Sequence, residues 1–199
     1  METKSNIKSV CCDMSPSYIS GISKEFPDAK ITFDIFHVMK AMNDGLNEVR
    51  IQEQKSKELK NTKFMWVTNE ENLTDKQRER LLKLQNQKLD TFRAYNIKES
   101  LRNLWKCESR EEAEQYLKKW YFRATHSRLG AIIEVAKTIN SHWDGILNYF
   151  DSRVTNGIVE SINSIVQLIK RNAIGYRNTL YFITVIHLKP GKLDFKLLI

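Results

Sequence analysis

Four residues in this sequence carry side chains that suit metal-dependent chemistry. Two are the carboxylates of Asp13 and Asp34, each of which follows a short apolar run. The others are His37, three residues after Asp34, and Glu160, in the first two turns of a predicted helix. Magnesium and manganese ions prefer carboxylate oxygens, and a pair of such ions about 3.5–4 Å apart can clamp the attacking and leaving oxygens of a phosphodiester. The set therefore indicates phosphoryl transfer as one hypothesis.

Each of these residues also has a simpler interpretation. An acid after a strand is more often a turn residue, and a single histidine is more often a hydrogen-bonded structural residue. Glu160 lies near the positive end of its helix dipole, which favours the ionised carboxylate even on a solvated face. Asn163 and Lys170, on the polar face of the same helix, could approach a phosphate backbone, although ordinary solvation explains them equally well. Residue types alone leave both interpretations open.

The stretch 7–40 must position the two aspartates. Apolar runs at 7–12 and 29–33 predict two short strands, and a helix that starts at Pro16 separates them. Two strands joined by a helix of this length form a βαβ unit, which predicts that the strands are parallel neighbours. Asp13 and Asp34 then lie at the carboxyl ends of the strands, where open α/β sheets bind their ligands.

A long all-helical block is predicted over 38–150. Thr74 with Gln77 matches the capping-box pattern that begins a helix. The apolar residues that follow predict one long helix with a break near Asn96.

The segment 152–178 predicts a further helix, which carries Glu160 and ends at Gly175. Its apolar residues recur at the spacing of one helix face. The following stretch, 180–188, is apolar and β-branched enough to form either a strand or a buried helix. The apolar stripe of the glutamate helix consists of Ile158, Ile162, Ile165, Val166 and Ile169.

Composition and charge are those of a globular protein with a basic end. The chain has 199 residues, of which 41% are hydrophobic and 28% are charged, which allows one domain with a large insertion. The formal net charge is +8, and residues 160–199 contain six basic and two acidic side chains. A basic balance is typical of nucleic-acid binding, while a lysine-rich proteome would produce the same balance.

The cysteines and the amino-terminal residues limit the compartment. Cys11, Cys12 and Cys107 show no CxxC spacing, so neither a disulfide framework nor a zinc site is indicated. No run approaches the length that spans a bilayer, and the first residues lack the apolar core of a signal peptide. These features predict a reducing, cytoplasmic environment.

Three segments resemble the catalytic domain of bacterial insertion-sequence transposases of the DDE class, in the ISL-type group. They are VCCDMSPSY, FPDAKITFDIFHVMKAMN and HWDGILNYFDSRVTNGIVESINSIVQLIKRNAIGYRN. The match keeps the family's order over nearly the whole chain. Its most specific parts are the segment around Glu160 and the Asp-x-x-His motif of Asp34 and His37.

This resemblance implies an RNase H-like fold in which two aspartates and a glutamate bind Mg²⁺ or Mn²⁺. By position, Asp13 resembles the second aspartate and Glu160 the final glutamate. Asp34 and His37 resemble the family's C/DxxH signature, which positions the active site or contacts DNA. The expected fold is α/β and mostly helical, with three parts. These parts are a partial RNase H-like core of two strands and a helix at 1–38, an all-helical insertion at 39–150, and a core helix with a basic tail at 151–199.

The resemblance also departs from the family at one point. The first aspartate of the family lies upstream of the motif that begins here at Ile7. We therefore expect a truncated, catalytically incomplete copy of an enzyme that cuts and joins DNA, with water or a DNA 3′-hydroxyl as nucleophile. The alternative is a non-catalytic fragment that binds DNA, or that assembles as a homo-oligomer or with an intact transposase. Expected DNA contacts are Asn163, Lys170, Arg171 and Arg177.

Overall fold

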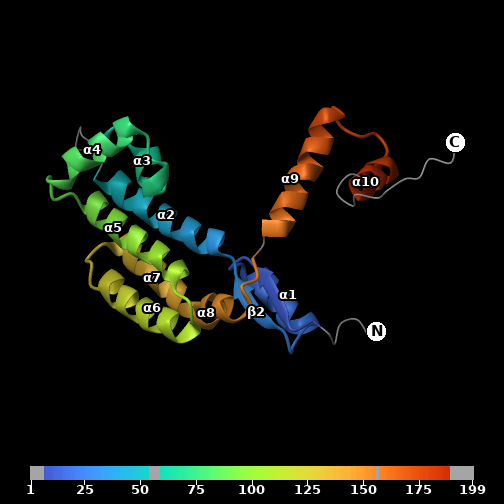
Figure 1. Cartoon of the computed structure of the whole chain (residues 1–199), viewed down its shortest axis with the longest axis horizontal. Helices are drawn as coiled ribbons and strands as arrows, with labels where there is room; N and C mark the ends of the chain where they lie inside the picture. Colours follow the sequence, from blue (N-terminus) through green and yellow to red (C-terminus); the bar gives the residue numbers. More distant parts are fainter. Residues whose placement is uncertain (1–6, 54–58, 156, 189–199) are drawn as a thin grey trace. The chain divides into compact units, whose positions relative to one another are not determined.

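The structure is a computed structural model that describes residues 7–53, 59–155 and 157–188, without the side chains of 158–160. The chain divides into two compact units, Met1–Val154 and Thr155–Ile199, which are described separately below. Helices dominate both units and a small sheet lies in the first (Figure 1). The expectation of a mostly helical α/β fold is therefore confirmed, while the RNase H-like core and the three-part division stay predictions.

Two parallel strands form the sheet of the first unit. Strand β1 (Ser9–Cys12) pairs with β2 (Lys30–Phe33), and helix α1 (Pro16–Glu25) connects them. Cys12 is paired with Phe33, and the Asp34 amide continues the ladder by donating to the Cys12 carbonyl at 3.0 Å. The predicted βαβ unit is therefore confirmed, together with the parallel direction of its strands.

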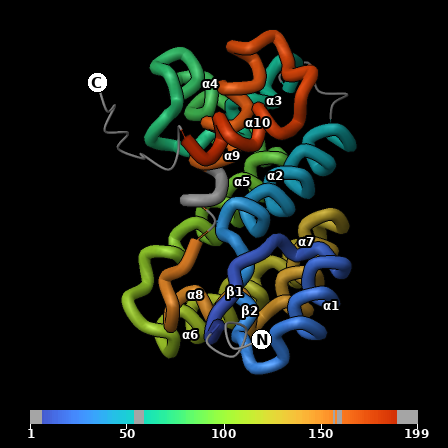
Figure 2. Tube along the Cα trace, turned by 90° about the vertical axis from the view of Figure 1, so that its right-hand side faces the viewer, coloured from blue at the N-terminus to red at the C-terminus, as the bar shows by residue number. Residues whose placement is uncertain are grey.

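The remainder of the first unit is a bundle of helices built around α2 (Ile35–Gln52). Helix α2 packs against α5 and α7, and its Met42 and Leu46 are fully buried. Figure 2 shows the bundle from a second direction, with α2 next to α7. The other elements are α3 (Lys63–Val67), η3 (Glu70–Asn72), α4 (Asp75–Gln85), α5 (Asp90–Asn103), η4 (Leu104–Lys106), α6 (Arg110–Thr125), α7 (Gly130–Ser141) and α8 (Trp143–Ser152).

Helices α4 and α5 show where the local prediction was right and where it was wrong. The capping box between Thr74 and Gln77 is present. The break near Asn96 is wrong, because α5 runs through that residue and the chain turns earlier, at Lys88, whose φ is 51°.

A carboxylate distant in sequence fixes the start of α5. Glu53 accepts hydrogen bonds from the amides of Asp90 at 2.9 Å and Thr91 at 2.8 Å.

A buried lysine fixes the other side of α5. Lys98 is fully buried, and its ammonium donates to the carbonyls of Trp66 at 2.8 Å and Thr68 at 3.2 Å. The same group pairs with Glu99 at 2.9 Å, and burial lowers the pKa of Lys98. Because a buried charge is tolerated only when it is paired and hydrogen-bonded, this lysine holds α5 against the end of α3.

Helix α8 attaches the sheet to the bundle. Asn148 donates from its side-chain amide to the Ile31 carbonyl of β2 at 2.7 Å. Gly145 faces the Phe33 ring so closely that an added Cβ would lie 2.3 Å from the Phe33 Cε2 atom. Asp151 of α8 forms an ion pair with Arg110 of α6 at 3.0 Å. A two-stranded sheet is not stable alone, so these contacts are what holds β2 in place.

The second unit contains helices α9 (Gly157–Asn172) and α10 (Thr179–Leu188). Helix α9 ends at Asn172, three residues before the predicted Gly175. Ile174 and Gly175 then adopt positive φ angles of 53° and 101°, and the Gly175 amide donates to the Lys170 carbonyl at 3.2 Å. The open question about 180–188 is settled in favour of a helix, because Asn178 caps it by accepting from the Leu180 amide at 2.8 Å. Within the ranges described, no helix is long and apolar enough to cross a bilayer.

The close approach of α8 to β2 gives a stability prediction. We expect Gly145→Ala to lower the free energy of unfolding by about 1–3 kcal/mol, because the new methyl group displaces the Phe33 ring. Gly21→Ala in α1 is the matched control. No atom lies within 4 Å of its added Cβ, so it should be neutral or stabilise by about 0.5–1 kcal/mol. Urea denaturation measures both, and equal effects would contradict this packing.

Candidate functional site

The sheet brings Asp13 and Asp34 to the same edge. Asp13 directly follows β1, Asp34 directly follows β2, and the last residues of the strands, Cys12 and Phe33, are register partners. The backbones of the two aspartates are therefore neighbours at the carboxyl end of the parallel pair. This is the arrangement that the sequence predicted.

Each aspartate also has a local structural role. Asp13 Oδ1 accepts the Ser15 amide at 2.8 Å just before α1, and Asp34 Oδ1 accepts the Phe36 amide at 3.0 Å as the cap of α2. Ser15 makes no side-chain cap bond itself. Among the described residues, neither Oδ2 atom has a hydrogen-bond partner, so each carboxylate keeps one oxygen for a ligand.

His37 lies in the first turn of the helix that Asp34 caps. The Asp-x-x-His spacing therefore corresponds to the cap and the third residue of α2, and the His37 amide donates to the Asp34 carbonyl at 3.1 Å. The His37 ring is half-buried and meets the Phe36 ring edge-on at 5.4 Å. No hydrogen bond to this imidazole occurs within the described part of the chain, so both ring nitrogens remain available.

The electrostatics at this edge are dominated by the two carboxylates. Burial raises the pKa of Cys11 to about 11, and the nearby negative charge of Asp34 adds to the effect. Burial likewise raises the pKa of Cys12 to about 11, with a contribution from Asp13. Both thiols therefore stay protonated at neutral pH, and the negative charge at the strand ends belongs to the aspartates.

Glu160 lies in α9, in the second unit, and its side chain is outside the described residues. Its predicted approach to Asp13 stays a prediction. No group of three or more His, Cys, Asp or Glu side chains that could hold a metal ion occurs among the residues that were described. Asp13 and Asp34 have the oxygen donors that a hard divalent cation prefers, but alone they form a partial ligand set.

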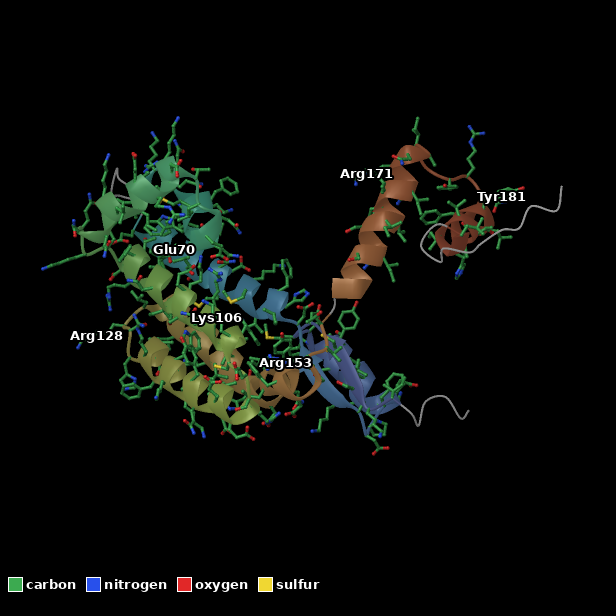
Figure 3. All side chains as sticks on the ribbon, viewed as in Figure 1. Glu70, Lys106, Arg128, Arg153, Arg171 and Tyr181 are labelled. Carbon is green, nitrogen blue, oxygen red and sulfur yellow. The ribbon has the colours of Figure 1, made fainter. Side chains whose placement is uncertain are left out.

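The predicted DNA-contacting residues are exposed on the second unit. Asn163, Lys170 and Arg171 project from α9, and Arg177 follows the turn after it. Figure 3 labels Arg171 near the carboxyl-terminal end of α9. Lys170 and Arg171 form no ion pair with any described residue, so their charges are available to an anionic partner. The other lysines of the predicted basic tail lie outside the described residues.

Sequence reasoning missed a pocket beside the Asp-x-x-His motif. The cavity has a volume of about 450 Å³ and combines one face of α2 with side chains from three other segments. Only the α2 members have a helical spacing that a sequence could reveal. No sequence signal connects them to the remaining three. The lining residues are Ile35, Phe36, Met39, Lys40, Asn43, Asn69, Arg102 and Trp105.

Comparisons with known proteins show what this chain is similar to. The family model DDE_Tnp_ISL3, described as "Transposase", matches residues 1–186. The transposase for insertion sequence element IS1001 of Bordetella parapertussis is 29% identical over 185 residues, which cover 88% of this chain and 46% of that protein. The transposase for insertion sequence element IS1557 of Mycobacterium tuberculosis is 26% identical over 206 residues, which cover 89% and 46% respectively. The chain thus spans about half the length of these curated relatives. No solved structure gives a significant match.

The two thiols give a prediction about pH. Since their ordinary pKa of 9.0 is raised to about 11 by folding, the unfolded chain binds fewer protons than the folded chain between these values. The free energy of unfolding should therefore fall as the pH rises from about 9 to 11. In the Cys11→Ala/Cys12→Ala double variant the fall should be shallower, with a constant offset from the wild type below pH 8. If urea denaturation gave the same pH dependence of the free energy of unfolding for the wild type and the double variant over the whole range, the prediction would be contradicted.

Proposed function

The chain belongs to the ISL3 family of DDE transposases, and from this premise we propose that it supplies part of a metal-dependent site that cuts and joins DNA. The observation that carries the proposal is the register of the sheet. Cys12 is paired with Phe33, so the strand ends present Asp13 and Asp34 together, each with one carboxylate oxygen unused by the described residues.

Asp13 and Glu160 are the proposed metal ligands. A bound Mg²⁺ or Mn²⁺ would activate the attacking hydroxyl and stabilise the charge that develops on the phosphate. Asp13 keeps one oxygen for the ion while the other, bound to the Ser15 amide at 2.8 Å, fixes the orientation of the carboxylate. Glu160 would come from the first turns of α9, where the helix dipole favours an ionised carboxylate.

Asp34 and His37 are proposed as positioning residues for the same site. Asp34 caps α2 and so sets the direction in which this helix leaves the sheet. His37, on the first turn, has an imidazole that can donate to a DNA phosphate or to a metal-bound water. The family resemblance implies three metal-binding carboxylates, and Asp13 and Glu160 match two of them. We assign the remaining one to no residue of this sequence, so catalysis is proposed for the complete protein.

The exposed basic residues of the second unit are proposed to bind the DNA backbone. Asn163, Lys170 and Arg171 recur at a spacing that places them on one face of α9, and Arg177 follows them. Phosphate contacts of this kind position a protein on DNA without reading its sequence. This interaction does not need the metal site, so DNA binding without catalysis is the second candidate function of the 199 residues.

A magnesium- or manganese-dependent nicking and strand-transfer assay on DNA carrying the element ends, run with the complete protein for which catalysis is proposed, tests the catalytic proposal. Asp13→Asn and Glu160→Gln should each reduce the rate at least about 100-fold, because even the outer partners of metal ligands are worth about 10–100-fold. The matched controls are Asp28→Asn, in the exposed turn before β2, and Glu134→Gln, on the exposed face of α7. Full activity in both site variants would contradict the proposed set of metal ligands.

DNA affinity at several salt concentrations tests the second candidate. The logarithm of the association constant should fall linearly with the logarithm of salt, with a slope of about 0.9 per phosphate contact. The Lys170→Gln/Arg171→Gln double variant should lower this slope by about two contacts. Lys83→Gln, an exposed lysine of α4, should leave it unchanged. Affinity that hardly depends on salt would count against any phosphate contact.

A further inference from the structure

We propose that the pocket beside the start of α2 binds a single unpaired nucleobase of the bound DNA. The inference rests on the proposed function, because it requires DNA to lie along the carboxyl ends of β1 and β2. It goes further by naming a place that the metal site does not use. The pocket, called the α2 pocket below, has a volume of about 450 Å³, within the roughly 300–1,000 Å³ of known ligand pockets.

The α2 pocket offers flat aromatic surfaces held in fixed orientations. The Trp105 ring stacks on Phe150 with centroids 6.0 Å apart and planes inclined by 6°, and Tyr149 meets its edge at 5.5 Å. These contacts fix the plane of the indole. Phe36 is 58% exposed although it lines the same pocket. Every nucleobase has a π-face, so aromatic side chains of this kind stack on bases with little sequence preference.

Polar groups among the lining residues match the edge of a base. The Asn43 side-chain Oδ1 and the Trp105 indole nitrogen have almost no accessible surface and no hydrogen-bond partner within the described ranges. Buried polar groups without partners are rare in folded proteins. Asn69 adds a second amide to the lining. Carboxamide side chains provide both donors and acceptors, which is what the hydrogen-bonding edge of a base requires.

The charge around the α2 pocket favours a nucleotide over a neutral aromatic molecule. Arg102 is neutralised by Glu99 at 2.8 Å and Glu71 at 2.5 Å. Lys40 is different, because it is exposed and forms no ion pair with the described residues. An unpaired cation among the lining residues of an aromatic pocket suits the phosphate next to an inserted base.

The position of the α2 pocket connects it to the proposed DNA path. Phe36 and Lys40 lie in the first two turns of α2, the same turns that begin with the Asp34 cap and contain His37. DNA that reaches Asp13 and Asp34 at the strand ends would therefore pass close to the pocket. A base that leaves the stack near the reacting phosphate would make the backbone there accessible, at the cost of unstacking.

Paired DNA hairpins test the inference on the full chain. The two probes are identical except for one bulged position, which carries adenine in one and an abasic residue in the other. Fluorescence anisotropy should show that the wild type binds the adenine probe about tenfold more tightly, which matches the lower end of measured base–aromatic stacking. Contacts to the duplex elsewhere are common to both probes, so they cancel in this ratio.

Phe36→Ala should reduce the ratio to about one, and its high exposure means that the fold tolerates the change. Phe122→Ala is the matched control, since Phe122 is a 64% exposed aromatic residue of α6 outside the pocket. Trp105→Phe should keep part of the preference, because it retains a ring.

The outcomes separate the inference from the function on which it rests. DNA binding with a ratio of one in the wild type would overturn the α2 pocket and leave the proposed function standing. A preference that survives Phe36→Ala would place the base elsewhere and also overturn it. Failure of the wild type to bind either hairpin would contradict both the proposed base pocket and the proposed DNA-binding function.

Discussion

The parallel pairing of β1 with β2 is the constraint on which the rest of the structure depends. Only this register, with Cys12 opposite Phe33, brings two carboxylates that are far apart in sequence to one edge. A two-stranded sheet has too little buried surface to hold its own register. The register is held instead by α8, through the contact of Gly145 with Phe33 and the hydrogen bond from Asn148 to the Ile31 carbonyl. The helical bundle therefore acts as a support for the site.

The fold of the first unit could be predicted from its sequence where local signals were strong. Two apolar runs separated by a helix beginning at Pro16 were enough for the βαβ unit, and Thr74 with Gln77 marked the start of α4. The end of α4 was missed because the start of α5 is fixed by Glu53, which lies 37 residues before Asp90 and caps α5 from the turn that follows α2. The state of 180–188 was ambiguous for a different reason. Its residues suit either structure, and the helix begins where the Leu180 amide donates to the Asn178 side-chain oxygen.

Some residues of the candidate site could be predicted from the sequence and others could not. Asp13 and Asp34 could be predicted because ligands bind at the carboxyl ends of the strands in open α/β sheets. Applying this rule requires only the direction of the strands and no knowledge of the tertiary packing. The role of Glu160 rests on family resemblance, since its side chain lies outside the described residues. The α2 pocket could not be predicted, because Asn69, Arg102 and Trp105 reach α2 only after the bundle has packed. The buried Lys98 helps to set that packing, and nothing in a sequence distinguishes it from a surface lysine.

The choice of side chain at position 34 links the structural and chemical roles of this edge. A helix cap needs only an oxygen acceptor, which serine, threonine or asparagine supplies as well as aspartate. Asp34 is nevertheless a carboxylate, only 6% exposed, placed beside the Cys11 thiol, whose pKa it helps to raise. A negative charge in such a place is unfavourable unless something offsets it. The described residues offer the carboxylate one hydrogen bond, from the Phe36 amide, and no positively charged side chain pairs with it. A metal ion bound at the carboxyl ends of the strands, as proposed above, would place a positive charge next to this carboxylate.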